Sequence, residues 1–230
     1  IDVDNSKQPN SRWYSGSGIY RDVNLWTGKG VYISHDKLRI TTLSVNDDMA
    51  VIEVCAQLKN IIGHGLEAEC LIEIKKDGQK TASDTQRVVF RSEQMQTVRV
   101  QIPIEHPKKW SPKQPALYEC HITTKFDDKI CDEAVSNFGI RVLALDPVHG
   151  LQINGETVKL RGTCIHHDNG VIGAETFKEA EWYRCKRLKE AGFNAIRSAH
   201  HPMSRAMLDA CDHIGMLVMD ELTDMWDKEK

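Results

Sequence analysis

The chain has 230 residues, of which 40% are hydrophobic, and its 30 basic and 33 acidic side chains leave a formal net charge of −3. This length and composition suffice for one large domain or two ordinary ones. The near balance of charges, without a run of like charges, argues against nucleic acid and anionic membranes as partners. No apolar run approaches the ~20 residues that a membrane-spanning helix needs.

Seven cysteines are spread along the chain without a CxxC pair, which argues against a zinc or redox motif. Several fall on apolar positions of strand or helix patterns, where a free thiol behaves as a small hydrophobic group. We therefore predict reduced core cysteines and a cytoplasmic location. The chain starts in polar sequence without a Met, so we expect a piece of a longer protein. The cysteines are Cys55, Cys70, Cys120, Cys131, Cys164, Cys185 and Cys211.

Residues 1–27 combine a polar lead-in with the passage RWYSGSGIYRDVNLW. Its small residues at 15–18 permit a tight turn, and Ile19, Val23 and Leu25 suit a strand. This segment is too short to fold alone.

Residues 28–145 contain short runs in which apolar and polar residues alternate, separated by turn residues. About seven such strands within roughly 110 residues are typical of an immunoglobulin-like β-sandwich. The absence of a Cys-Trp-Cys pattern argues against a true antibody-type domain. The clearest apolar sets are Ile52, Val54, Ala56 and Leu58; Cys70, Ile72 and Ile74; Val98, Val100 and Ile102; and Tyr118, Cys120, Ile122 and Phe126.

Residues 146–230 change to a different pattern. A hairpin is predicted at Asn154–Gly155, because these residues suit a type I′ turn. The strand RGTCI then runs into polar residues, and a helix follows with a capping-box pattern at Thr176 and Glu179 and a closing glycine at Gly192.

The passage NAIRSAHHP, from residue 194, supplies the next strand. A second helix is expected from Pro202 and Ser204 to Gly215, followed by a last apolar strand from Met216 to Trp226. Strands that alternate with helices indicate a parallel α/β fold. A (β/α)₈ barrel needs about 250 residues, so these elements make less than half of one.

Polar side chains follow each of the three predicted parallel strands, and parallel strands bring such residues to one rim. One imidazole of each neighbouring histidine pair would turn away, which weakens a metal site. The cluster could instead bind a polyhydroxylated substrate, or it could consist of satisfied polar groups without a ligand. The groups at this rim are His166, His167 and Asp168; Arg197, His200 and His201; and Asp220, Glu221 and Asp224.

Three passages resemble glycoside hydrolase family 2, which includes β-galactosidases, β-glucuronidases and β-mannosidases. WYSGSGIYRDVNLW is similar to the last strands of the family's sugar-binding jelly roll, and WSPKQPALYEC is similar to a passage of its immunoglobulin-like domain. RGTCIHHDNGVIGA and GFNAIRSAHHP, followed by LVMDE, resemble the opening of its catalytic barrel.

The resemblance implies a multi-domain β plus α/β protein. It consists of a jelly-roll tail (1–27), an immunoglobulin-like β-sandwich (28–145) and the first strands and helices of a TIM barrel (146–230). It also implies that both catalytic glutamates lie beyond Lys230, so that the chain itself holds no catalytic residue and is inactive.

The resemblance implies roles for individual residues. His166 and His200 match histidines that bind sugar hydroxyls or stabilise the transition state, and Arg197 matches an arginine that braces the nucleophilic carboxylate. His167 stands where some family members have Glu, and Asp168 follows directly; this variant is associated with β-galactosidase-like members. Asp220 and Trp226 complete the expected substrate-binding set, with Trp226 as either a stacking platform for a sugar ring or a packing residue.

The expected activity is that of a retaining β-galactosidase, with β-glucuronidase, β-mannosidase or a non-catalytic β-sandwich module as alternatives. The expected partner is a carbohydrate, and a homo-oligomer is possible. We expect no cofactor in this chain, although the resemblance allows a divalent cation in the parent protein.

Overall fold

The computed structural model describes residues 2–4, 6, 18–92 and 94–222. The described chain divides into two compact units. One consists of residues 26–111 and 116–157, here called the sandwich unit, and the other of residues 1–25, 112–115 and 158–230, here called the barrel unit. The sequence pattern places a domain boundary at residue 145, whereas in the structure residues 146–157 group with the sandwich unit.

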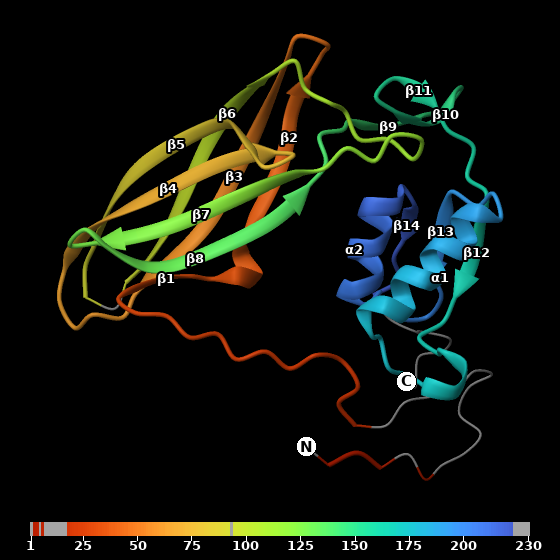
Figure 1. The fold of residues 1–230 in the computed structure, drawn as a ribbon, viewed down its shortest axis with the longest axis horizontal. Coiled ribbons are helices and arrows are strands. Elements are labelled where there is room, and N and C mark those ends of the chain that lie inside the picture. Colours follow the sequence, from red (N-terminus) through yellow and green to blue (C-terminus); the bar gives the residue numbers. More distant parts are fainter. Residues whose placement is uncertain (1, 5, 7–17, 93, 223–230) are drawn as a thin grey trace. The chain divides into compact units, whose positions relative to one another are not determined.

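The sandwich unit contains two four-stranded sheets of antiparallel strands (Figure 1). This confirms the immunoglobulin-like β-sandwich that the alternating pattern predicts. The first sheet contains β1 (Val31–Ile33), β2 (Arg39–Val45), β3 (Met49–Asn60) and β6 (Met95–Glu105). The second sheet, in the order β5-β4-β7-β8, contains β4 (Leu66–Lys76), β5 (Gln79–Phe90), β7 (Tyr118–Phe126) and β8 (Lys129–Phe138).

The apolar members of each alternating run form the core between the two sheets. In β3, every second residue from Ala50 to Leu58 is fully buried. Ile72 of β4 and Ile122 of β7 pair across neighbouring strands and are also buried. Each such aliphatic side chain stabilises the fold by about 1.5–3 kcal/mol relative to an exposed position. The period of two in the sequence therefore corresponds directly to the buried face of each sheet.

Strands β1 and β2 lie end to end along one edge of β3, while β6 occupies the other edge. A short 3₁₀ helix, η1 (His35–Lys37), separates them. Side chains of the opposite sheet bind β1 directly: Thr124 Oγ1 donates to the Val31 carbonyl at 2.7 Å, and the Ile33 amide donates to Asp132 Oδ2 at 2.8 Å. These two bonds tie the sheets together at one side of the sandwich.

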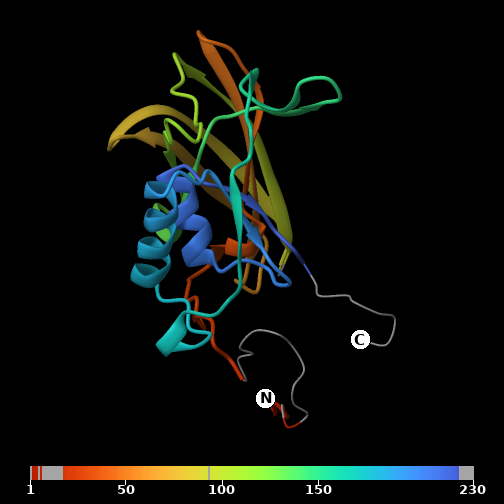
Figure 2. The same ribbon diagram turned by 90° about the vertical axis from the view of Figure 1, so that its right-hand side faces the viewer.

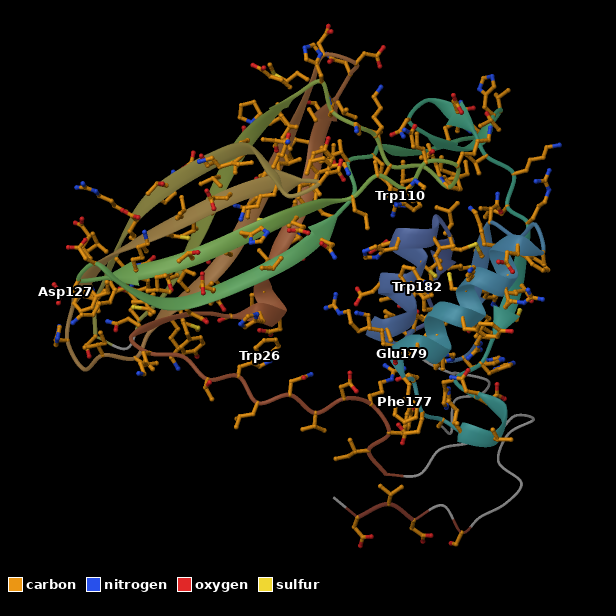
Figure 3. The ribbon with its side chains drawn as sticks, in the orientation of Figure 1. Trp26, Trp110, Asp127, Phe177, Glu179 and Trp182 are labelled. Carbon is orange, nitrogen blue, oxygen red and sulfur yellow. The ribbon has the colours of Figure 1, made fainter. Side chains whose placement is uncertain are left out.

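Two-residue turns connect the paired strands of the second sheet. Asp77 and Gly78 join β4 to β5, and Asp127 and Asp128 join β7 to β8; Figure 3 labels Asp127 at the hairpin tip. All four residues have positive φ, between 52° and 79°, which a type I′ turn requires. Aspartate and glycine accept this conformation more readily than most residues.

A small antiparallel sheet follows the sandwich strands, formed by β9 (Leu143–Asp146), β10 (Gly150–Ile153) and β11 (Glu156–Thr157). Asn154 and Gly155 connect the last two strands with φ values of 53° and 83°. The hairpin predicted at these residues is therefore present, with the expected turn. Asn154 Nδ2 also donates to the carbonyl of the buried Trp110 at 3.0 Å.

The barrel unit alternates strands and helices, as the sequence predicts. Its three strands pair in parallel in the order β12-β13-β14. Strand β14 is shorter than predicted, because extended pairing stops at Met219 and the predicted strand ends at Trp226, outside the described residues. The elements are β12 (Gly162–Ile165), η2 (Gly170–Ile172), α1 (Lys178–Glu190), β13 (Ala195–Ser198), α2 (Arg205–Ile214) and β14 (Leu217–Met219).

Both helices cover the same face of the three-stranded sheet (Figure 2). Ile165 of β12 and Ile196 of β13 are buried in the core that the sheet forms with these helices. On the other face, the aligned residues Cys164, Arg197 and Met219 are exposed. The uncovered face therefore carries an arginine at its centre.

The two helices begin differently from one another. Ser204 caps α2 as predicted, since its side chain accepts a hydrogen bond from the Met207 amide at 3.2 Å. The capping box predicted at Thr176 and Glu179 is wrong, because Phe177 is the N-cap of α1 and makes no side-chain cap bond (Figure 3). The chain reaches the first turn of α1 one residue later than the pattern implies, so Thr176 is outside the capping position.

The strand predicted around residues 19–25 does not form. Within the described segment 18–30 no strand is present, and Ile19, Val23 and Leu25 are each more than 60% exposed. A strand is stable only when its backbone groups pair with a neighbour, and no described strand pairs with this segment. The assignment of residues 1–27 to a jelly roll stays a prediction.

All seven cysteines are free, and four of them are buried. Burial raises the pKa of the Cys70 and Cys120 thiols to about 12, so both act as neutral core groups. None of the described helices is long and apolar enough to cross a membrane.

Candidate functional site

The loops that follow β12, β13 and β14 meet at one edge of the barrel unit, because the carboxyl ends of parallel strands lie on the same side. The structure thus brings together the three residue sets that the sequence predicts at this rim. Of the predicted substrate-binding residues, Trp226 lies outside the described residues, as does Asp224 of the rim set.

Arg197 and Glu221 form an ion pair at this edge. Arg197 Nε donates to Glu221 Oε1, and Arg197 Nη1 lies 3.8 Å from Cys164 Sγ on the neighbouring strand. The hydrogen bond to Glu221 raises the pKa of the Arg197 guanidinium, so it stays a cation at every accessible pH. The Arg197 side chain is 47% exposed.

Glu221 also fixes the backbone of the loop after β13. Its Oε2 accepts a hydrogen bond from the His200 amide at 2.7 Å. This bond, together with the bond from Arg197, lowers the pKa of the Glu221 carboxyl. A carboxylate that stays ionised can hold both groups, so Glu221 links the end of β14 to the arginine and the loop of β13.

His200 adopts an unusual backbone conformation, with φ at 71°. A non-glycine residue with positive φ is uncommon, and such residues concentrate at functional sites. The conformation places the His200 ring parallel to that of His166, with a centroid separation of 5.7 Å and an interplanar angle of 10°. The two histidines predicted to bind sugar therefore lie side by side, although they belong to different loops.

The second histidine of each pair points elsewhere. His167 and His201 meet edge to face at 4.6 Å, and Tyr20 stacks on His167 at 5.5 Å. Burial lowers the pKa of both imidazoles. His201 Nδ1 bonds to the Ala199 carbonyl at 2.9 Å. The prediction that neighbouring histidines turn to opposite sides agrees with these two separate pairs.

The predicted carboxylates differ in their surroundings. Asp220 Oδ1 accepts a hydrogen bond from the Met203 amide at 2.8 Å, so this carboxylate also holds the start of the segment that leads into α2. Asp168 is partly buried in the loop directly after the two histidines. The substrate-binding roles of Asp168 and Asp220 stay predictions.

Sequence reasoning missed the contribution of the segment before the sandwich. Arg21 Nη2 donates to the Pro202 carbonyl, directly after the histidine pair of the β13 loop. Its neighbour Tyr20 supplies the ring on His167. The only available signal was the position of both residues inside the passage that resembles the family.

No group of three or more His, Cys, Asp or Glu residues is placed to hold a metal ion in the part of the chain that the structure describes. The imidazoles instead form two ring pairs, and the Glu221 carboxylate is engaged by Arg197 and the His200 amide. The arrangement offers imidazole and carboxylate groups for hydrogen bonds to hydroxyl groups.

Two family models match the chain. The model for glycosyl hydrolases family 2 matches residues 31–141, and the model for the family 2 TIM barrel domain matches residues 148–225. The chain belongs to glycoside hydrolase family 2. Residues 31–141 thus correspond to the family's β-sandwich, and residues 148–225 to the start of its barrel.

Known proteins agree with this assignment. A β-galactosidase of Bacteroides ovatus is 34% identical over 241 residues, and a putative β-glucuronidase of Formosa agariphila is 32% identical over 229 residues. Both matches include the whole chain, which spans 27% and 22% of these relatives, about a quarter of their length. The crystal structure of a family 2 member from Bacteroides cellulosilyticus has a TM-score of 0.89 and 36% identity, covering 97% of this chain and 31% of that one.

Proposed function

We propose that this chain is part of a retaining glycoside hydrolase that releases terminal β-linked sugars, with a β-galactoside as its substrate. The observation that carries the proposal is the group of His166, His200, Arg197 and Glu221 at the carboxyl ends of parallel strands. This is the edge at which TIM-barrel enzymes place their active sites. Membership of a glycosidase family supplies the class of reaction.

In the proposed site, His166 and His200 donate hydrogen bonds to sugar hydroxyl groups. Arg197 supports a carboxylate, which in this chain is Glu221. A retaining mechanism needs two further carboxyl groups about 5 Å apart, one as nucleophile and one as acid and base. We assign both to glutamates beyond Lys230. The chain by itself then contributes only part of the active site and is inactive.

Charge favours a neutral sugar over a uronic acid. The charged side chains at this edge include the carboxylates of Asp168, Asp220 and Glu221, and the guanidinium groups of Arg197 and Arg21. Arg197 is already paired with Glu221, and Arg21 donates to the Pro202 carbonyl. Among these described groups the carboxylates outnumber the guanidinium groups, and we take this as support for a galactoside rather than a glucuronide.

The test is an assay of the parent protein on nitrophenyl β-galactoside, β-glucuronide and β-mannoside. We expect the galactoside to have the highest kcat/KM. Preference for the glucuronide or the mannoside would refute the choice of sugar, and no turnover of any of the three would refute the proposed activity.

The sugar is also expected to contact residues other than the two histidines. A carbohydrate is the proposed partner, and Asp168, Asp220 and Trp226 are the proposed further contacts to it. Titration of the parent protein with phenyl β-D-thiogalactoside, by calorimetry, checks these contacts: each of the three changed to Ala should weaken binding.

A further inference from the structure

The loop between β12 and α1 carries His166, and an arginine of α1 binds two points in the first part of that loop. Arg184 Nη2 donates to the His166 carbonyl at 2.8 Å, and Arg184 Nη1 donates to Asn169 Oδ1 at 2.8 Å. The two donors belong to one planar guanidinium, so the separation of the two acceptors is fixed by its geometry. Residues 166–168 therefore run between two points that a single side chain defines.

A buried carboxylate fixes the arginine and the asparagine in turn. Glu181 is 2% exposed, and its Oε1 accepts a hydrogen bond from Asn169 Nδ2 at 2.7 Å. The same oxygen lies 3.5 Å from Arg184 Nη1. A buried carboxylate is costly unless it is paired and hydrogen-bonded, and these contacts satisfy that requirement.

Asn169 also binds the later part of the loop. The Asn169 amide donates to the Gly173 carbonyl at 2.7 Å, and Asn169 Nδ2 also donates to the Glu175 carbonyl at 2.9 Å. Asn169 thus uses its backbone N–H, its side-chain NH₂ and its side-chain oxygen. Asn169 is therefore held at its backbone and at its side chain.

We infer that Arg184, Glu181 and Asn169 are positioning residues, which hold the His166 imidazole beside His200 in the orientation that sugar binding needs. The inference rests on the proposed function, since it assigns the network to the proposed sugar site. Arg184 binds the backbone carbonyl of His166, so replacement of its guanidinium group should displace the His166 imidazole. Displacement of a binding group by about 1 Å can cost about 10²-fold in rate.

The first test compares two conservative changes on the same helix of the parent protein. Arg184→Lys keeps the positive charge beside Glu181 but removes the planar fork that joins His166 to Asn169. We expect kcat/KM on the nitrophenyl glycoside that the native protein turns over best to fall about 10²-fold. The matched control is Arg187→Lys, since Arg187 is exposed and pairs with Glu190 at 2.9 Å, and it should leave kcat/KM within about 2-fold of the native value.

A second variant separates geometry from charge. Glu181→Gln keeps an oxygen that can accept from Asn169 and removes the charge beside Arg184, so kcat/KM should fall between the native and Arg184→Lys values. Binding of the phenyl thioglycoside of that same preferred sugar, measured by calorimetry, should weaken in the same order. The inference would be overturned if Arg184→Lys and Glu181→Gln both bound the sugar and turned over the substrate as well as the native protein.

A double-mutant cycle with His166→Ala distinguishes positioning from a general loss of folding. If Arg184 acts through the His166 imidazole, Arg184→Lys should cost less than about 3-fold once that imidazole is gone. An undiminished 10²-fold cost in the His166→Ala background would overturn the inference. If the native parent turns over no glycoside, the proposed function has failed instead, which the native assay shows before any variant is made.

Discussion

The two units differ in how far their buried surfaces are complete. The sandwich unit has a core enclosed between two sheets, with Ile52, Ile72 and Ile122 fully shielded from water. The barrel unit buries only the sheet face beneath its two helices, and leaves Arg197 and Met219 exposed on the other. The sandwich unit therefore buries the inner faces of both its sheets, whereas the barrel unit leaves one face of its sheet exposed.

The largest expected effect is the loss of stability caused by a cavity in the sandwich core. Ile72→Ala removes a fully buried side chain, so we expect the free energy of unfolding to fall by about 2–5 kcal/mol. Urea denaturation followed by circular dichroism gives the value. The control is Val89→Ala on β5, whose side chain is 66% exposed, and a change above about 0.5 kcal/mol there would contradict the assignment of the core.

The next largest effect should concern activity and arise in the barrel unit. Arg197→Ala leaves Glu221 without its ion-pair partner, and we expect kcat/KM of the parent protein to fall about 10²-fold. Kinetics on the preferred nitrophenyl glycoside measure it. Arg87→Ala in the sandwich, where Arg87 is exposed and 3.8 Å from Glu67, is the matched control. Equal losses in both variants would mean that Arg197 has no special role at the site.

A smaller effect distinguishes the two helix starts. Ser204→Ala removes the cap of α2 and should lower the free energy of unfolding by about 1 kcal/mol. Thr176→Ala should cost less than about 0.5 kcal/mol, because its hydroxyl caps nothing in α1. Thermal unfolding of the two variants in parallel gives the comparison. A larger cost for Thr176→Ala would restore the capping box that the sequence suggests.

The smallest effect that we expect is a dependence of stability on pH. Burial lowers the pKa of His167 and His201 in the folded state, so between the folded and unfolded pKa values the unfolded chain binds more protons. The stability that this confers is complete above about pH 6.5 and is lost as the pH falls below it. The unfolding midpoint should therefore decrease from pH 7.5 to 5.5, and His201→Gln should reduce that decrease. An equal decrease in the variant would exclude His201 as a source.

The sandwich could be predicted because the signal lies within each strand. Residues such as Ile72 and Ile74 alternate with polar neighbours, and the apolar residues of all strands pack into one core. The hairpin at Asn154–Gly155 was equally local, since its turn depends only on two residues. The meeting of the three rim loops also followed from the sequence, because parallel strands end at one edge.

Other features depend on side-chain contacts that the hydrophobic periodicity of the sequence does not predict. The network of Asn169, Glu181 and Arg184 joins a loop to a helix, and nothing in the spacing of these residues shows that their side chains meet. The pairing of Arg197 with Glu221 was likewise not predicted. The sequence pattern extends the last strand to Trp226, whereas β14 ends at Met219. The segment at 19–25 has the composition of a strand, but composition cannot supply a pairing partner.

The register of β12 against β13 also has a consequence for folding. Gly162 pairs with Ala195, and the whole of α1 lies between them, so this pairing must wait until a long stretch of chain has been closed into a loop. The hairpins at Asp77–Gly78 and Asp127–Asp128 close after only two residues. Local pairs form in microseconds, whereas distant parallel pairs are slow. We therefore expect the sandwich hairpins to form first during synthesis, and the proposed sugar site to be assembled last.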